Sequence, residues 1–200
     1  MNKRSGIESK KKILGAAVKV FSRYGYAGAS IREIAKASGI SIGGVYLYFK
    51  NKEELYLSLI KERISEKNQR IRSAVESAGS PAEALSVFVD MHLEYAMKNK
   101  ELILMHIREH GFTFRMDIKR EYLRRQTRMV GKIIERGIRE GEFRKCNVNE
   151  TAKIIMGSLR GIMLSMAVED ERSITAKGLN ELLMRGLLKD NDYRPNSDNS

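Results

Sequence analysis

One stretch of the sequence constrains the fold more than any other: SIREIAKASGISIGGVYLYFKNKEEL, from Ser30 to Leu55. Gly39 interrupts a good helical pattern there, and a second short run begins at once with Gly43 and Gly44. A glycine inside a helix costs about 1 kcal/mol relative to alanine. Helix stability therefore does not explain these residues, and the stretch indicates a local function.

The stretch has the start and stop signals of two short helices joined by a tight turn. Ser30 and Glu33 form a capping box, Gly39 supplies the positive φ of the turn, and Ser41 caps a second helix that runs to about Phe49. This pattern predicts a helix-turn-helix, whose second helix lies in the major groove of DNA. The alternative is an ordinary helical hairpin with a glycine turn.

Helical periodicity continues through the rest of the chain, with two prolines and no confident strand. We expect an all-α fold of about nine helices. An N-terminal three-helix domain with the helix-turn-helix would cover residues 1–54, with residues 1–8 as a flexible basic arm. A larger helical domain would cover residues 55–188, with its last helix starting at Ser173, and residues 189–200 would be a disordered tail.

The positive charge is concentrated near the N-terminus. Residues 1–50 contain ten Lys and Arg and two Glu, which is +8 of the net charge of +12. Such a basic segment favours a polyanionic partner, nucleic acid first and an anionic membrane surface second. Cys146 is the only cysteine, so an intrachain disulfide is excluded. No signal peptide or membrane span is predicted, which indicates a cytoplasmic protein.

The N-terminal segment also resembles a known family. IESKKKILGAAVKVFSRYGYAGASIREIAKASGISIGGVYLYFKNKEEL, ending at Leu55, resembles the N-terminal domain of the TetR family of bacterial transcriptional repressors. GIREGEFR at Gly137–Arg144 resembles the end of a long helix in the ligand domain of that family. The resemblance implies a set of DNA contacts, which are Ser30, Arg32, Ser41, Ile42, Gly43, Gly44, Tyr46, Leu47, Tyr48 and Lys52.

The second helix of the motif departs from the usual family pattern. Family members often have a basic or polar residue where Ile42 stands, Thr or a similar residue at Gly44, and His at Leu47. Few side chains of this helix can therefore read bases through hydrogen bonds. We expect contacts of Ile42 or Leu47 with thymine methyl groups, together with DNA shape, to contribute more of the specificity.

The resemblance implies that the larger domain binds a small molecule and forms a homodimer. For an apolar or amphipathic effector, the candidate pocket residues are Met91, Tyr95, Met105, His106, Phe112, Phe114, Tyr122 and Met129, although methionine and aromatic residues at helical spacing are also typical of core. The candidate dimer residues lie on the last two helices and are Ile155, Leu159, Ile162, Met163, Met166, Leu179, Leu182, Leu183 and Leu187; the alternative is intrachain core. A palindromic operator requires two copies of the motif, roughly 34–36 Å apart or a multiple of that distance.

No catalytic residues, metal site or cofactor are predicted. Motifs for phosphate binding, nucleophilic catalysis or zinc hydrolysis are absent from the sequence, and His106 and His110 lack a convincing third ligand. A solvated helix face is the simplest reading of Arg124, Arg125 and Arg128, with an anion-binding role as the alternative. The sequence thus predicts a dimeric repressor that a small apolar or amphipathic ligand releases from DNA. The alternative is a DNA-binding or architectural protein that needs no ligand.

Overall fold

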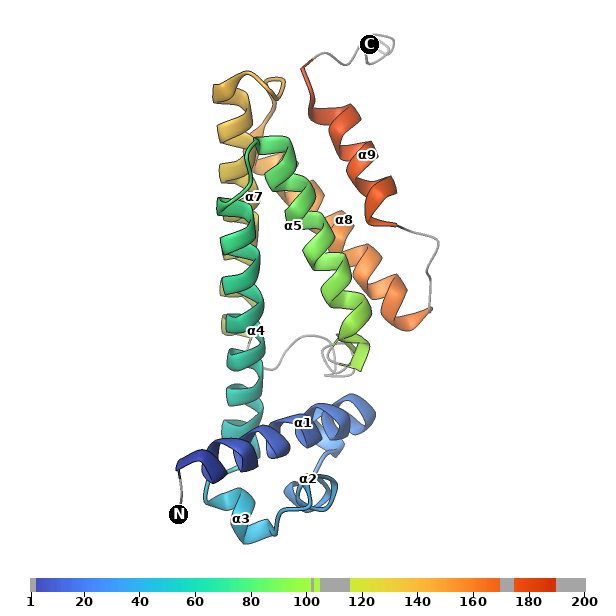
Figure 1. Cartoon of the computed structure of the whole chain (residues 1–200). Helices are drawn as coiled ribbons and strands as arrows, with labels where there is room; N and C mark the ends of the chain where they lie inside the picture. The colour runs from blue at the N-terminus through green and yellow to red at the C-terminus, as the bar shows by residue number, and fades with distance from the viewer. Residues whose placement is uncertain (1–2, 102, 105–115, 170–174, 190–200) are drawn as a thin grey trace. The chain divides into compact units, whose positions relative to one another are not determined.

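The computed structural model describes residues 3–101, 103–104, 116–169 and 175–189. Within them the fold is all-α, as predicted, and the extended structure is limited to an isolated bridge between Phe143 and Leu188. The described residues form eight helices, which are labelled in Figure 1. They are α1 (Lys3–Gly28), α2 (Ile31–Ser38), α3 (Ile42–Tyr46), α4 (Lys52–Glu76), α5 (Pro81–Lys98), α7 (Met116–Glu140), α8 (Val148–Val168) and α9 (Ala176–Leu187).

The chain divides into two compact units. Unit 1 consists of Met1–Gln69 and Asn99–Met116, and unit 2 consists of Arg70–Lys98 and Asp117–Ser200. Helix α4 therefore contributes residues to both units. The predicted start of the last helix at Ser173 and the predicted tail lie outside the described residues, apart from Lys189 at the start of that tail.

The core of unit 1 is formed where α1 packs against α2 and α4 begins. Phe21, Ile34 and Leu55 are fully buried there, and Phe49, at 2% exposed, also belongs to the core. The predicted flexible arm is wrong for its described part, because α1 already begins at Lys3. The helical conformation of α1 breaks at Gly25, which has φ 69°.

Unit 2 is built around α5, which packs against α8 and α9 (Figure 1). Its apolar core combines residues from α4, α5, α7, α8 and α9, with Leu85, Phe88 and Val130 completely buried. By length and composition alone, α8 could also cross a membrane. In the structure, one side of α8 belongs to this core, since Ile155 and Leu159 are 1% and 0% exposed.

The segment GIREGEFR has a packing function at the end of α7. Gly141 ends the helix with φ 78°, and the chain turns so that the ring of Phe143 lies directly against Gly137. A Cβ atom on Gly137 would be 2.2 Å from Phe143 Cδ2, so only glycine fits here without displacing the ring. The resemblance noted in the sequence thus corresponds to a specific close contact.

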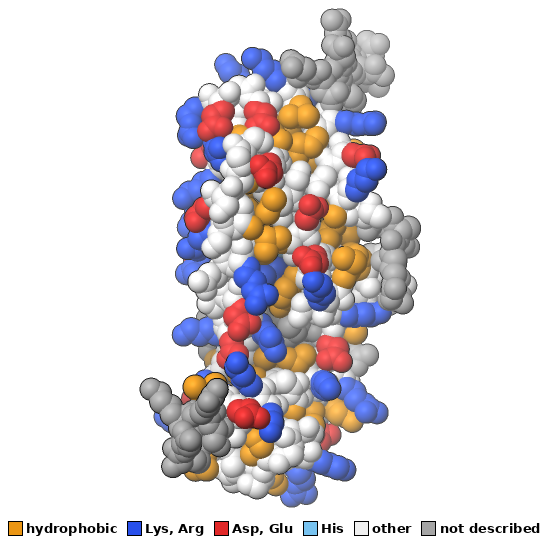
Figure 2. All heavy atoms as spheres, in the orientation of Figure 1, with side chains coloured by type: hydrophobic (Ala, Val, Ile, Leu, Met, Phe, Trp, Pro, Cys, Tyr) orange, Lys and Arg blue, Asp and Glu red, His pale blue; other side chains and the backbone are white. Residues whose placement is uncertain are grey.

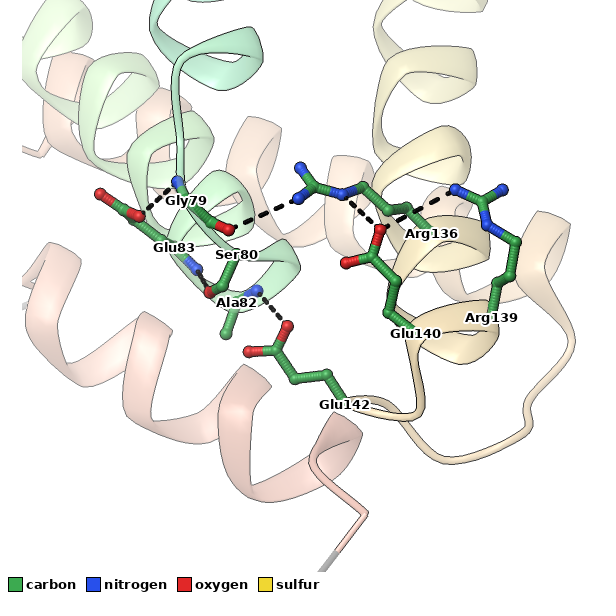
Figure 3. A network of polar contacts seen from close by, with 8 residues as sticks. All are labelled: Gly79, Ser80, Ala82, Glu83, Arg136, Arg139, Glu140 and Glu142. Atoms are coloured by element: carbon green, nitrogen blue, oxygen red, sulfur yellow. Dashed lines mark hydrogen bonds and ion pairs between the residues drawn. The ribbon is translucent and has the colours of Figure 1, made fainter.

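Polar contacts join this end of α7 to the start of α5 (Figure 3). Glu142 Oε2 accepts a hydrogen bond from the Ala82 amide at 3.3 Å, and Arg136 donates to the Gly79 carbonyl at 3.5 Å. Arg136 also pairs with Glu140 at 2.9 Å. Because the free amides at a helix start need acceptors, Glu142 helps to satisfy the first turn of α5.

The structure corrects the predicted dimer residues on α8 and α9. Ile155, Leu159, Leu179 and Leu187 are buried in the core of the protomer and are not available to a partner. Four others are only half-buried and pack against the same core, namely Ile162, Met163, Met166 and Leu183. Of the predicted set, Leu182 alone is well exposed, at 68%. Periodicity did not distinguish the inner face of these helices from an outer face that is also apolar.

Candidate nucleic-acid interface

Helix α2 and the turn after it have the geometry that the sequence predicted. The Glu33 amide donates to Ser30 Oγ at 3.2 Å, and the Ser30 amide donates to Glu33 Oε2 at 2.9 Å, which completes the capping box. At the other end, Gly39 has φ 69°, and the Ile40 amide donates to the Ala35 carbonyl at 3.2 Å. These bonds determine where α2 ends and where the chain turns toward α3.

Helix α3 is short and presents apolar side chains outward. The Gly44 amide donates to Ser41 Oγ at 3.0 Å, and the buried Val45 anchors the inner side of the helix. Ile42, Tyr46 and Leu47 are 41%, 50% and 76% exposed. The helix ends at Tyr46 rather than near Phe49, so Leu47 and the half-buried Tyr48 lie in the turn that follows.

The two glycines of α3 have different roles. A Cβ atom on Gly44 would be 2.7 Å from Ile40 Cγ2 and 3.1 Å from Ser41 Oγ, so Gly44 is required by packing and by the cap. A Cβ atom on Gly43 would meet nothing within 4 Å. Packing within the chain therefore does not require Gly43. Close approach of another molecule to the exposed first turn of α3 would explain it.

Among the predicted phosphate contacts at α2, Ser30 and Arg32 are placed differently. The Ser30 hydroxyl is already used in the capping box, and it also donates to Glu33 Oε2 at 2.8 Å. The Arg32 side chain is exposed. Arg32 is thus the cation at the start of α2 that remains available to a phosphate group.

Lys52, another of the predicted DNA contacts, has a role inside the protein. Its Nζ donates to the carbonyls of Tyr26 and Ala29 at 2.8 Å each and to that of Ala27 at 3.3 Å, and it lies 4.7 Å from the ring centroid of Tyr26. Three N–H groups thus meet three carbonyls, two at the end of α1 and one in its connection to α2. Lys52 connects the start of α4 to this segment.

A feature of the sequence could have indicated this role of Lys52. The residue stands at the first position of α4, and the N-terminal end of a helix carries partial positive charge, so a cation is unfavourable there. A lysine in that position needs acceptors from elsewhere. The structure supplies them 23 to 26 residues earlier in the chain.

Charge alone does not locate the interface. On the face shown in Figure 2, Lys and Arg side chains are spread over both units. Within the described residues, no group of three or more His, Cys, Asp or Glu side chains is positioned to hold a metal ion. The distinguishing features are therefore the geometry of α2 and α3 and the exposed side of α3.

Unit 2 contains the described half of the predicted pocket residues. Met91 and Met129 pack against the core, and Tyr95 and Tyr122 are half-buried. Burial raises the pKa of the Tyr122 hydroxyl, with a further increase from Tyr95 and an opposing effect of Arg160. The other four, Met105, His106, Phe112 and Phe114, lie outside the described residues, as does His110. His92 and Gln126, neither of which was predicted for the pocket, are also buried in this unit.

A capped helix-turn-helix with an exposed, glycine-rich second helix, followed by a helical second unit, defines the protein as a DNA-binding transcriptional regulator. A family model described as bacterial regulatory proteins, tetR family, matches residues 13–59. A second, described as tetracyclin repressor-like, C-terminal domain, matches residues 78–164. The chain therefore belongs to the TetR family.

Several relatives match nearly the whole chain. The fatty acid metabolism regulator protein of Bacillus subtilis (strain 168) is 26% identical over 182 residues, 88% of this chain and 93% of the relative. Among solved structures, the fatty acid degradation regulator FadR from Bacillus halodurans has a TM-score of 0.77 and 27% identity, covering 88% of this chain and 98% of that chain. FadR from Bacillus subtilis in complex with stearoyl-CoA has the same fold, with a TM-score of 0.75 and 24% identity over 90% of this chain and 97% of that chain.

Proposed function

We propose that this protein is a homodimeric repressor in the bacterial cytoplasm, and that a fatty acyl thioester binds unit 2 and releases the protein from its operator. The observation that carries the DNA-binding part is the outward side of α3. Ile42, Tyr46 and Leu47 are exposed on an element that the structure holds firmly through Ser41 and Val45. Large apolar side chains in such a position are suited to contact with another molecule.

The composition of this surface indicates how the operator is recognised. Ile42 and Leu47 provide no hydrogen-bonding groups, so they suit the methyl group of thymine in the major groove. Gly43 allows the first turn of α3 to approach the DNA closely. Arg32, Tyr46 and Tyr48 would hold the motif against the phosphate backbone.

The effector class follows from the relatives and from the interior of unit 2. A curated relative and a solved structure are named as regulators of fatty acid metabolism and degradation, and a second solved structure contains stearoyl-CoA. In this chain the apolar core of unit 2 also contains polar side chains, with His92 and Gln126 only 2% and 1% exposed. An apolar interior with a few fixed polar groups is typical of sites that bind and orient an amphipathic molecule.

The dimer face that we propose lies on the outer side of α8. Ile154, Leu164 and Val168 are 60%, 46% and 57% exposed, and Gly157 and Gly161 face open space. These five residues are separated by three, four, three and four positions, the spacing of a helix that packs along another helix. The two glycines would allow the partner helix to approach closely. Leu182 on α9 extends the apolar surface.

The central experiment is a fluorescence-anisotropy titration with the protein's own upstream intergenic DNA. We expect saturable binding that weakens with salt, and release by stearoyl-CoA but not by free coenzyme A at the same concentration. Binding that no acyl thioester changes would contradict the effector and favour a ligand-independent regulator. Absence of specific binding to upstream or genomic fragments would contradict the DNA-binding assignment.

The dimer face is tested with two neighbouring leucines. Leu182→Arg should give a folded monomer in light scattering, because this side chain is exposed and a charge there opposes association. Leu183→Arg is the control, since Leu183 packs against the core and its replacement should lower the thermal stability of unit 2. A stable dimer of the Leu182→Arg variant would contradict the proposed face.

A further inference from the structure

A groove of about 660 Å³ runs along α7 beside the start of α8 in unit 2. Leu123, Val148 and Ala152 provide an apolar lining. Around it stand five cations, which are Arg120, Arg124, Arg128 and Lys132 on α7 and Lys153 on α8. One carboxylate, Glu135, also lines the groove. The fatty acyl chain proposed above does not need this concentration of positive charge.

The positions of ion pairs on α7 distinguish the groove from an ordinary solvated helix face. Outside the groove, Arg125 pairs with Glu121 at 2.7 Å and Arg136 pairs with Glu140 at 2.9 Å. Within the described residues, none of the five groove cations has an ion-pair partner. A glutamate four residues away would stabilise each arginine on a helix at little cost. The groove instead retains a net positive charge.

The arginines of the groove also act on Glu121, the residue that follows Arg120. The hydrogen bond from Arg125 lowers the pKa of the Glu121 carboxyl, and the charges of Arg125, Arg124 and Arg128 lower it further. Two groove cations thus act on a carboxylate that they do not contact. An anionic ligand in the groove would experience the same attraction at shorter distance.

The spacing of the cations defines the kind of ligand that fits. Arg120, Arg124, Arg128 and Lys132 follow one another at intervals of four residues, so they extend over roughly 18 Å of helix. Guanidinium groups bind phosphate through paired hydrogen bonds. The first turn of α8, at Val148 and Asn149, adds the positive end of a helix dipole. A single carboxylate would use only one end of such a row.

We propose that this groove binds a nucleotide-sized group with several phosphates and an apolar portion. That this group is the coenzyme A part of the effector itself rests on the proposed function. The apolar lining at Leu123 and Ala152 would contact the uncharged segments of the ligand. The arginines would then select thioesters of coenzyme A over free fatty acids, which lack phosphate groups.

The test compares two double variants that remove the same charge from the same helix. Arg124→Gln with Arg128→Gln changes the groove, whereas Arg125→Gln with Arg139→Gln changes arginines that lie beside Glu121 and Glu140 outside it. Isothermal titration calorimetry measures binding of free coenzyme A and of 3′-dephospho-coenzyme A. Anisotropy measures release of operator DNA by stearoyl-CoA, and melting curves verify that each variant is folded.

We expect the groove variant to bind coenzyme A at least tenfold more weakly and to need correspondingly more stearoyl-CoA for DNA release. The control variant should stay within twofold of wild type, and wild type should bind 3′-dephospho-coenzyme A more weakly than coenzyme A. Equal weakening of both variants would overturn the groove as a site. So would wild-type protein that binds no coenzyme A.

The outcomes separate this inference from the proposed function. If stearoyl-CoA releases all three proteins from DNA alike, the groove assignment fails while the acyl thioester remains the effector. If coenzyme A binds through Arg124 and Arg128 but no acyl thioester releases the DNA, the groove site stands and the proposed effector fails.

Discussion

The helix-turn-helix and the last two helices are both helical pairs with exposed apolar side chains, but different interactions determine their positions. In α2 and α3, hydrogen bonds between near neighbours, such as Ser30 with Glu33 and Ser41 with Gly44, define the helix ends and the turn. In α8 and α9, packing against α5 decides which side faces inward. Local hydrogen bonds are specific to residue type, whereas an apolar face fits more than one arrangement.

The difference separates two kinds of exposed apolar surface. On α3, the exposed Ile42 and Leu47 sit on a segment whose conformation is determined locally. On α8, Ile154 and Leu164 are exposed because the opposite side of the helix packs into the core of unit 2. Substitutions that disturb the long-range packing should therefore have larger effects on stability than those that disturb the motif.

The largest effect is expected from Gly137→Ala in α7. The added Cβ would be 2.2 Å from Phe143 Cδ2, and the ring is buried, so it must move. We expect a loss of about 3 kcal/mol in the free energy of unfolding, typical of overpacking in a core. Urea denaturation followed by circular dichroism measures it.

Gly131→Ala in the same helix is the matched control. A Cβ there would be 3.7 Å from Val148 Cγ1, an ordinary contact, so the gain in helix propensity should dominate and stabilise the protein by up to about 1 kcal/mol. Equal effects of the two substitutions would show that Phe143 does not pack against Gly137 as described, and that this long-range contact does not control the stability of unit 2.

Features that depend on local hydrogen bonds could be predicted from the sequence, whereas features that depend on long-range packing could not. The caps at Ser30 and Ser41 and the turn at Gly39 were predicted, because each depends on residues within a few positions of one another. The inner face of α8 could not be, since Ile154 and Ile155 are equally apolar and only the packing of α5 distinguishes them.

The candidate site shows the same limit. The contact of Lys52 with carbonyls more than twenty residues away has no local signature beyond the unfavourable position of a cation at a helix start. The same is true of the groove, because the cations of α7 and Lys153 of α8 come together only in the folded unit.

Lys67 is a buried charge on the part of α4 that belongs to unit 1, and its burial should lower the free energy of unfolding. Burial lowers its pKa from 10.5 to about 8. Below pH 8 both the folded and the unfolded protein carry the proton, so the full cost of the buried ammonium is present. As the pH rises from 8 to 10.5, the folded state releases its proton first, and this cost disappears, so stability rises with pH.

Lys67→Met should therefore raise the free energy of unfolding at pH 7 by about 2 kcal/mol and remove this rise with pH. Urea titrations at pH 7, 8 and 9.5 measure both quantities. Lys61→Met, at an exposed position of the same helix, should retain the pH dependence of wild type. A Lys67→Met protein that still gains stability between pH 8 and 9.5 would place the responsible group elsewhere.

Variants of Lys52 and Lys50 distinguish a lysine that positions the motif from one that contacts a phosphate group. Lys52→Met removes three hydrogen bonds from a charged donor and should lower stability by about 2 kcal/mol, without changing the salt dependence of DNA binding. Lys50 is exposed, so Lys50→Met should leave stability unchanged and reduce the slope of log K against log salt by about 1. A reduced slope for Lys52→Met would instead support the direct DNA contact that the family resemblance implies.

The smallest and most local effects concern the adjacent glycines of α3. Gly44→Ala should lower the melting temperature, because its Cβ would be 2.7 Å from Ile40 Cγ2, a side chain that can shift only partly. Gly43→Ala meets open space, so it should leave the melting temperature unchanged or slightly raised. Its effect should be on DNA binding, which we expect to weaken about tenfold, or roughly 1.4 kcal/mol, since the methyl group would stand between α3 and the DNA. If Gly43→Ala binds operator as tightly as wild type, the first turn of α3 does not approach the DNA closely, and recognition falls to Tyr46 and Leu47 at the other end of the helix.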